Sequence, residues 1–183
     1  MKAAPLRRYA LFFAIAGGGL ALDLASKQYM FDWLGMPDMP GDHLHWLKPG
    51  LIAFQTALNE GALFGIGQGM AAVFSLLSIA AAIGVLMWLF LGDAAQDLLL
   101  TLALGAVTAG ILGNLYDRLG LPGLHWSGNG ALHNVGAPVH AVRDWILVMI
   151  GTYHWPNFNV ADSLLVTGAM VLVLQTFRKG KSC

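Results

Sequence analysis

Asp162 stands at the start of the last apolar run of the chain, in the sequence Phe158-Asn159-Val160-Ala161-Asp162-Ser163. A carboxylate at the centre of a membrane-spanning helix costs roughly 2.5–3.5 kcal/mol on insertion scales, so an acid in such a run is a candidate functional group. An aspartate at the start of a helix also has a plain structural role, because it caps free N–H groups or interacts favourably with the helix dipole. Taken alone, this residue leaves both interpretations open.

Other polar residues occur near the ends of the remaining apolar runs. They are Asp23 and Lys27 in the first run, Asn59-Glu60-Gly61 ahead of the second, Asn114 and Asp117-Arg118 at the end of the third, and Arg143-Asp144 between the third and the fourth. Ionisable groups in membrane proteins usually pair with one another or line a water-filled pathway. An Asp–Lys pair four residues apart on one helix also fits a purely structural role.

Two carboxylates held near a shared water molecule form an acid–base pair. Like charges a few ångström apart cannot both ionise, so such a pair holds one proton between them. One carboxylate then takes a proton from water while the other polarises a peptide carbonyl, which is the chemistry of an aspartic protease.

Other hydrolytic classes fit the sequence less well. It contains neither a Gly-x-Ser-x-Gly elbow nor a His-Glu-x-x-His pair, and its only cysteine is Cys183. His43 and His45 would share one face of a strand, but loop histidines are more often plain surface residues. We therefore expect no metal site and no cofactor.

The elements that must position these groups are membrane helices. Hydrophobic residues make up 57% of the chain and charged residues only 11%, against about 25% charged in a typical soluble domain. A span of about 20 apolar residues crosses the hydrocarbon core. We expect one all-α membrane domain over residues 1–183, with four transmembrane helices at about 9–30, 70–91, 98–117 and 158–177.

The two long segments between helices, 31–69 and 118–157, are broken by proline and glycine and are expected to be outer loops. In the first, residues 51–57 indicate a short strand, so we expect a small extracytoplasmic strand-containing element. In the second, the apolar stretch from Trp145 to Ile150 is too short to span a membrane.

Basic residues at both ends of the chain predict its orientation. Lys2, Arg7 and Arg8 precede the first span, and residues 178–181 after the last span include three more basic side chains. The positive-inside rule then places both termini in the cytoplasm, and all the polar clusters near one outer surface. There is no basic patch with interleaved aromatic residues, so nucleic acid is not an expected partner.

Four short blocks, in this order, resemble the conserved blocks of the bacterial lipoprotein signal peptidases, or signal peptidase II. They are Leu-Asp-Leu-Ala-Ser-Lys at 22–27, Asn-Glu-Gly-Ala-Leu-Phe-Gly at 59–65, Gly-Asn-Leu-Tyr-Asp-Arg at 113–118 and Phe-Asn-Val-Ala-Asp-Ser at 158–163. Each block is weak alone, but four in sequence are specific. The resemblance covers residues 7 to 178.

The resemblance implies an intramembrane aspartic endopeptidase of the bacterial inner membrane, with its active site facing the periplasm. Such an enzyme removes the signal peptide from diacylglyceryl-modified prolipoproteins by cutting just before the lipidated cysteine. Its partners would be those signal peptides and membrane lipid, and the cyclic peptide globomycin would inhibit it. We expect a monomer.

By the same resemblance, Asp144 and Asp162 correspond to the catalytic dyad. The supporting polar or substrate-binding residues correspond to Asp23, Lys27, Asn59, Gly61, Asn114, Arg118 and Asn159. One departure from the family is the long segment between Leu119 and Arg143, which could form an elaborated lid or a loop with a partner. It makes Asp117 a competitor of Asp144, and we interpret Asp117 as the structural partner of Arg118.

Two alternatives come from other functional classes. A small proton-coupled transporter would use Asp23 and Asp162 as relay acids, and would need further polar residues at mid-depth in its helices. The sequence offers no charged residue between Gly61 and Gly92. A catalytically inactive lipid-binding relative is the second alternative, and the full set of acids argues against it.

Overall fold

The computed structural model describes residues 4–61 and 67–179. In chain order these form α1 (Leu6–Leu34), β1 (Leu44–Lys48), β2 (Ile52–Asn59), α2 (Ala71–Leu91), a short 3-10 helix η2 (Ala94–Gln96), α3 (Leu98–Arg118), β3 (Val142–Ile150), β4 (Tyr153–His154) and α4 (Val160–Lys179). Each of the four α-helices is long and apolar enough to cross a membrane, so the four predicted spans are confirmed. Residues 62–65 of the second sequence block lie outside the described residues, as do Lys2 and Cys183.

The chain divides into two compact units. The first, which we call the helical unit, comprises residues 1–23, 78–113 and 160–183. The second, which we call the sheet unit, comprises residues 24–77 and 114–159. Three helices, α1, α2 and α3, contribute residues to both.

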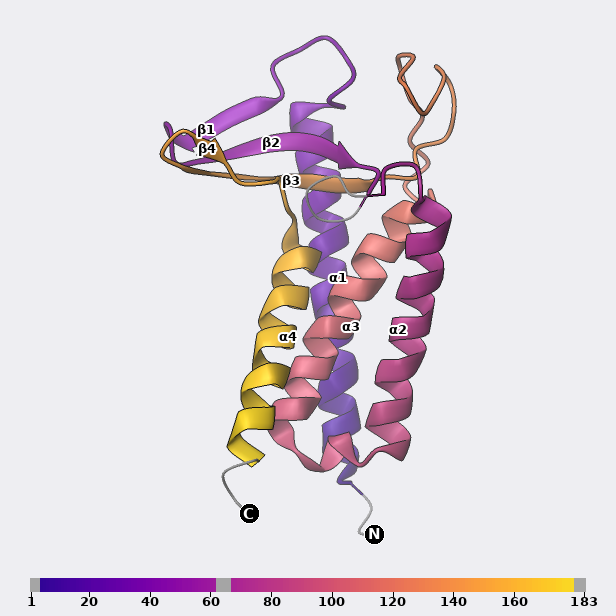
Figure 1. Ribbon diagram of the computed structural model, residues 1–183, viewed down its shortest axis with the longest axis vertical. Coiled ribbons are helices and arrows are strands. Elements are labelled where there is room, and N and C mark those ends of the chain that lie inside the picture. Colours follow the sequence, from indigo (N-terminus) through magenta and orange to yellow (C-terminus); the bar gives the residue numbers. More distant parts are fainter. Residues whose placement is uncertain (1–3, 62–66, 180–183) are drawn as a thin grey trace. The chain divides into compact units, whose positions relative to one another are not determined.

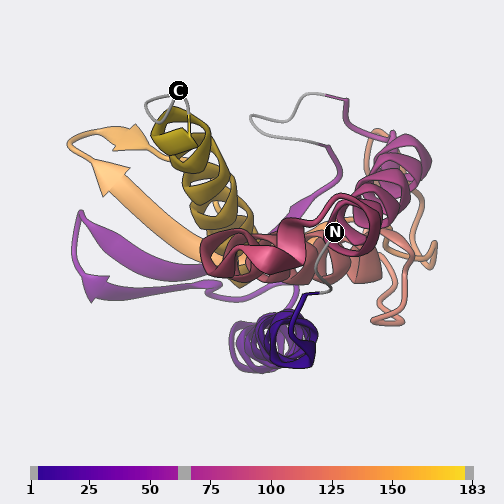
Figure 2. The ribbon, with the colours of Figure 1, turned by 90° about the horizontal axis from the view of Figure 1, so that it is seen from below.

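In the helical unit, α3 lies between α2 and α4 (Figures 1 and 2). It is the most buried span: 67% of its most apolar window is buried, against 11–17% for the other three. Glycines allow its neighbours to approach closely. A Cβ atom on Gly110 would overlap the carbonyl oxygen of Ala161 and the side chain of Leu165, and one on Gly105 would meet Ile15 at 3.1 Å. Small residues at such contacts are a common basis of helix packing in membranes.

The sheet unit contains an antiparallel sheet in the order β1-β2-β3-β4. Strand β2 lies between β1 and β3 (Figure 1). The register places Ala57 opposite Asp144 and Asn59 opposite Val142. It is irregular between Phe54 and Ala57, where β2 bulges. This register brings the end of β2 beside the acid on β3.

The prediction that residues 118–157 form an irregular outer loop is wrong in part, because they contain β3 and β4. The strand β3 begins at Val142, and includes Asp144 itself. Its apolar residues from Trp145 to Ile150 are mostly β-branched, aromatic or otherwise bulky, which favours a strand. The stretch that is too short to span a membrane therefore pairs with the predicted strand, which the structure extends to residues 52–59.

The long segment between α3 and β3 folds back on itself through an isolated β-bridge between His125 and Pro138. The N–H of Trp126 donates to the carbonyl of Ala137 at 2.9 Å, and the N–H of Gly136 donates back to Trp126 at 2.8 Å. The N–H of Val139 donates to Leu124 at 2.9 Å. We call residues 124–139 the inserted hairpin. A buried apolar cluster packs its base within the sheet unit, formed by Phe31, Met36, Trp126, Val139 and Ala141.

Candidate active site

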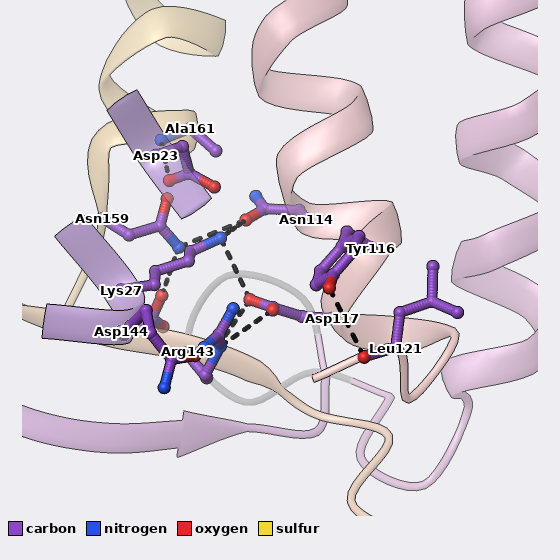
Figure 3. A network of polar contacts seen from close by, with 11 residues as sticks. Asp23, Lys27, Asn114, Tyr116, Asp117, Leu121, Arg143, Asp144, Asn159 and Ala161 are labelled. Carbon is purple, nitrogen blue, oxygen red and sulfur yellow. Dashed lines mark hydrogen bonds and ion pairs between the residues drawn. The ribbon is translucent and has the colours of Figure 1, made fainter. Parts of the chain in front are cut away.

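Six buried polar residues of the sheet unit form one connected set of hydrogen bonds and ion pairs, which we call the buried polar network (Figure 3). Each has an exposed fraction of 5% or less. Burial of charges is tolerated only where they are paired and hydrogen-bonded, so these residues constrain one another's positions. They are Lys27 of α1, Asn114 and Asp117 of α3, Arg143 and Asp144 of β3, and Asn159, which directly precedes α4.

Asp117 lies between the two cations of this network. Its Oδ2 atom is 3.0 Å from the Nζ of Lys27, and its Oδ1 accepts a hydrogen bond from the Nε of Arg143 at 2.9 Å. The backbone N–H of Arg143 also donates to Oδ2, at 3.1 Å. Both oxygens of the carboxylate are therefore engaged by cations or by a backbone N–H, an environment that suits a structural anion.

Asp144 lies at the other end of the network. The amide nitrogen of Asn159 donates to its Oδ1 at 2.6 Å, and also to the side-chain oxygen of Asn114 at 3.2 Å. The Nζ of Lys27 donates to the same oxygen of Asn114 at 3.0 Å. Asn159 thus orients the carboxylate of Asp144 with a neutral donor, while Lys27 and Asn114 hold Asn159 in place.

A cleft of about 400 Å³ opens beside Asp144. Its walls are the end of β2 (residues 57–59), Glu60, Gln68, Asp144 and the pair 156–157 ahead of α4. A concave site with a few convergent polar groups is the usual form of a ligand-binding site. Of the two buried acids in the network, Asp144 is the one that lines this cleft.

Three of the other predicted residues meet at the turn after β2: Asn59 at the end of β2, Gly61 in the turn, and Arg118 at the end of α3. The side-chain oxygen of Asn59 accepts a hydrogen bond from the N–H of Gly61 at 3.1 Å. The carbonyl oxygen of Gly61 accepts one from the guanidinium of Arg118 at 3.2 Å, and that guanidinium lies 5.4 Å from the ring centroid of Phe74. Arg118 therefore holds the turn and α2, and the prediction that it is the partner of Asp117 is wrong. Lys27 and Arg143 are the cations on Asp117, because α1 and β3 bring them to it.

The helical unit holds Asp23 and Asp162. The Oδ1 of buried Asp23 accepts a hydrogen bond from the backbone N–H of Ala161 at 2.8 Å, in the first turn of α4 (Figure 3). The N–H groups of a first helical turn have no partner within the helix, so Asp23 satisfies one of them. A Cβ atom on Gly113 would overlap its carboxylate. Asp162 lies in the same first turn of α4, at the start of the helix as predicted. Its side chain is half-buried. Its catalytic role stays a prediction.

Sequence reasoning placed Arg143 among the polar clusters but gave it no role in the site, and it did not identify Gln28. The Nη1 of Arg143 donates to the side-chain oxygen of Gln28 at 3.2 Å, in addition to the contact with Asp117. A signal was present, because Arg143 and Asp144 are the two charged residues of an otherwise apolar strand. Among the described residues, no three His, Cys, Asp or Glu side chains lie close enough to hold a metal ion.

Comparisons with known proteins identify the family. The chain matches the family model of signal peptidase (SPase) II over residues 15–178. It is 46% identical over 179 residues to a lipoprotein signal peptidase of Rhodopirellula baltica, covering 94% of this chain and 74% of that protein. It is 30% identical over 171 residues to a lipoprotein signal peptidase of Rhodococcus jostii, covering 93% and 74%.

The fold is also that of a known enzyme. A solved structure described as a bacterial membrane enzyme is similar to this chain with a TM-score of 0.76 and 24% sequence identity, covering 98% of this chain and 94% of that one. The family model and the two relatives confirm the family predicted from four short blocks. The chain belongs to the signal peptidase II family of aspartic peptidases and is a multi-pass membrane enzyme.

Proposed function

We propose that the enzyme removes the signal peptide from diacylglyceryl-modified prolipoproteins, by hydrolysing the peptide bond just ahead of the lipidated cysteine. The observation that carries this proposal is the cleft on the sheet unit. It is open to a peptide segment, and Asp144 lines it with its carboxylate oriented by Asn159. The relatives named lipoprotein signal peptidase support the substrate class.

In this proposal Asp144 and Asp162 are the catalytic dyad. Asp162 is three residues further along the chain than Asn159, the residue that orients Asp144. One ionised carboxylate takes a proton from water, and the water oxygen bonds to the carbonyl carbon while the protonated carboxyl donates its proton to the carbonyl oxygen. The tetrahedral diol then collapses and the C–N bond breaks. The carboxyl group that took a proton from water donates it to the amine of the cysteine, while the other carboxylate takes a proton back from a hydroxyl of the diol. The products are the free signal peptide and the lipoprotein.

The other predicted residues would support this reaction in two ways. Asn114 and Asn159, held by Lys27, keep the carboxylate of Asp144 in one orientation. Asn59, Gly61 and Arg118 fix the turn after β2 that forms one side of the cleft, and Asp23 fixes the first turn of α4, where Asp162 lies.

The location we propose is the bacterial inner membrane, with both termini in the cytoplasm and the cleft on the periplasmic side. Arg7 and Arg8 lie in the first turn of α1, and Arg178 and Lys179 are the last residues of α4. Basic residues flank the cytoplasmic ends of spans. The substrate would then reach the cleft from the outer leaflet of the membrane.

A proton-coupled transporter has less support. Such a protein needs polar groups along a path through its helices. The two buried hydroxyls of α3, on Thr101 and Thr108, each donate to a carbonyl of their own chain four residues earlier. They are thus used within the local backbone, and α2 carries no charged residue.

The proposal can be tested with purified enzyme and a matched pair of prolipoproteins. The two substrates would share one sequence, one with a diacylglyceryl group on the cysteine and one without it. We expect mass spectrometry to find the lipidated protein cut directly before the cysteine, and the unlipidated one cut at less than about a tenth of that rate. Equal cutting of both, or cutting elsewhere, would refute the proposed substrate class.

A further inference from the structure

The cleft beside Asp144 has a second carboxylate in its wall. Glu60 directly follows Asn59, the last residue of β2 that pairs with β3, and is the only glutamate in the chain. The remaining described lining consists of neutral side chains, at residues 57–59, Gln68 and the pair 156–157. As far as the described residues form it, the cleft thus contains two acids and no Lys or Arg.

Glu60 is in contact with the inserted hairpin. Its Oε1 is 3.8 Å from the Nε2 of His133, and the two side chains are 23% and 16% exposed. Glu60 is therefore not a free surface acid, because a residue more than seventy positions away in the sequence lies against it.

The position of His133 is itself closely defined. Its ring stacks on that of Trp126, with centroids 3.5 Å apart and an angle of 3° between the planes. The N–H of Gly130 donates to its carbonyl at 2.9 Å, and a Cβ atom on Gly130 would meet its ring at 2.5 Å. The glycine therefore makes room for the imidazole at this point of the hairpin.

The base of the hairpin is held by hydrogen bonds between Ser127 and Asp38. The N–H of Ser127 donates to the Oδ2 of Asp38 at 2.7 Å, and its hydroxyl donates to the Asp38 carbonyl at 3.2 Å. Burial raises the pKa of Asp38, but hydrogen bonds from Ser127, together with smaller contributions from the backbone of Asp38 and Gly128, lower it, so that the pKa lies below the ordinary value. Together with the apolar cluster around Trp126, this contact makes the hairpin a fixed wall rather than an open loop.

We propose that Glu60, held by His133 of the inserted hairpin, is a specificity-determining residue that selects against acidic residues beside the scissile bond of the substrate. This rests on the proposed function, because it takes the cleft as the place where the substrate chain lies. A substrate carboxylate there would face Glu60 and Asp144 without a lining cation to offset them. Like charges brought together across an interface are a strong means of excluding a ligand, and a lysine or a neutral side chain meets no such penalty.

The test uses three lipidated prolipoprotein peptides that share one signal peptide and differ only in the residue directly after the lipidated cysteine, which is Lys, Gln or Glu. We expect kcat/KM of the wild-type enzyme to be at least about tenfold higher for the Lys peptide than for the Glu peptide. The isosteric variant Glu60→Gln should lower this ratio severalfold. Asp42→Asn, which removes one negative charge outside the cleft lining, should leave the ratio unchanged.

The part played by the hairpin is tested by His133→Phe. Phenylalanine keeps an aromatic ring to stack on Trp126 but removes the nitrogen that lies against Glu60. We expect a smaller fall in the Lys-to-Glu ratio than Glu60→Gln causes. A ratio unchanged by Glu60→Gln, or equally lowered by Asp42→Asn, would overturn the proposal. Failure of the wild-type enzyme to cut even the Gln peptide would instead refute the proposed function.

Discussion

At the scale of single residues, the two aspartates of α3 and β3 have different surroundings. Asp117 is held by Lys27 and Arg143, while Asp144 lines the cleft and receives the amide of Asn159. Loss of Asp117 would leave two buried cations without their carboxylate, which typically costs about 3–5 kcal/mol of stability. The burial and pairing of Asp117 therefore suit a structural role, and leave Asp144 as the better candidate for catalysis.

Asn159 should control the turnover of the enzyme by orienting the carboxylate of Asp144. Asn159→Ala removes the donor at 2.6 Å from Oδ1, so the carboxylate loses its fixed orientation. We expect kcat to fall roughly 100-fold, which is the cost of misplacing a reacting group by about 1 Å. The measurement is steady-state cleavage of a lipidated prolipoprotein, normalised to folded enzyme. Asn134→Ala, at an exposed position of the inserted hairpin, is the control. A kcat for Asn159→Ala equal to that of the control would exclude this positioning role.

At the scale of elements, the packing of α3 against α4 depends on glycine at one position. Gly110→Ala would drive its methyl group into the carbonyl of Ala161 and the side chain of Leu165. Overpacking of this kind costs about 1–3 kcal/mol. Gly18→Ala in α1 is the matched control, because a Cβ there meets nothing within 4 Å. We expect thermal unfolding in detergent to show a lower Tm for Gly110→Ala and an unchanged or higher Tm for Gly18→Ala, since alanine favours a helix by about 0.5–1 kcal/mol. Equal Tm values for the two variants would show that α3 and α4 tolerate a wider separation.

The end of α1 should respond to pH through His43. The helix ends with Gly35 at φ 79°, and the two ring nitrogens of His43 lie 2.6 Å from the carbonyl oxygen of Leu34 and 2.7 Å from that of Met39. These carbonyl acceptors, with smaller contributions from Asp42 and Asp38, raise the pKa of His43 above its ordinary value of 6.5. Both nitrogens donate only in the protonated ring.

A raised pKa in the folded state stabilises the fold below the ordinary value, and this stabilisation is lost as the pH rises through the folded-state pKa. The Tm of the wild type should therefore exceed that of His43→Gln most clearly at acidic pH, with the difference shrinking as the pH rises. A difference that is constant with pH, or that grows, would contradict the assignment of the protonated ring.

Much of the element order could be predicted from the sequence, because long apolar runs define spans directly. Strand β3 could not, since its apolar stretch has no partner visible in the sequence and becomes a strand by pairing with β2. In the site, the four sequence blocks indicated Asn114, Asn159 and the acids that they contain, among them Asp23 and Asp162. The pairing of Asp117 with Arg143 joins residues 26 positions apart across a hairpin, and no local spacing encodes it. The inserted hairpin was missed for the same reason, as its order comes from contacts with Asp38 and Glu60.

At the scale of the whole molecule, the arrangement of four spans predicts which segments face each side of the membrane. The turn between α2 and α3 contains Asp93, and the inserted hairpin contains Trp126. Because basic residues flank the N-terminal end of the first span and the C-terminal end of the last, both termini should be cytoplasmic, and reporter fusions at Asp93 should report the cytoplasm and fusions at Trp126 the periplasm. A periplasmic signal at Asp93 would reverse the orientation, and would put the cleft on the wrong side for a translocated substrate.

The most direct test of the catalytic dyad is the rate of cleavage of a lipidated prolipoprotein by Asp144→Asn, Asp162→Asn and the double variant, each normalised to folded enzyme. Residues that act as a unit are not additive, so we expect each single variant to lose at least about a thousandfold in kcat and the double variant to be scarcely slower than either. Asp117→Asn should lower stability but leave measurable turnover in the folded fraction, since Asp117 is held by Lys27 and Arg143. Near-normal turnover by Asp144→Asn, together with an inactive but folded Asp117→Asn, would contradict the account and pair Asp117 with Asp162 instead.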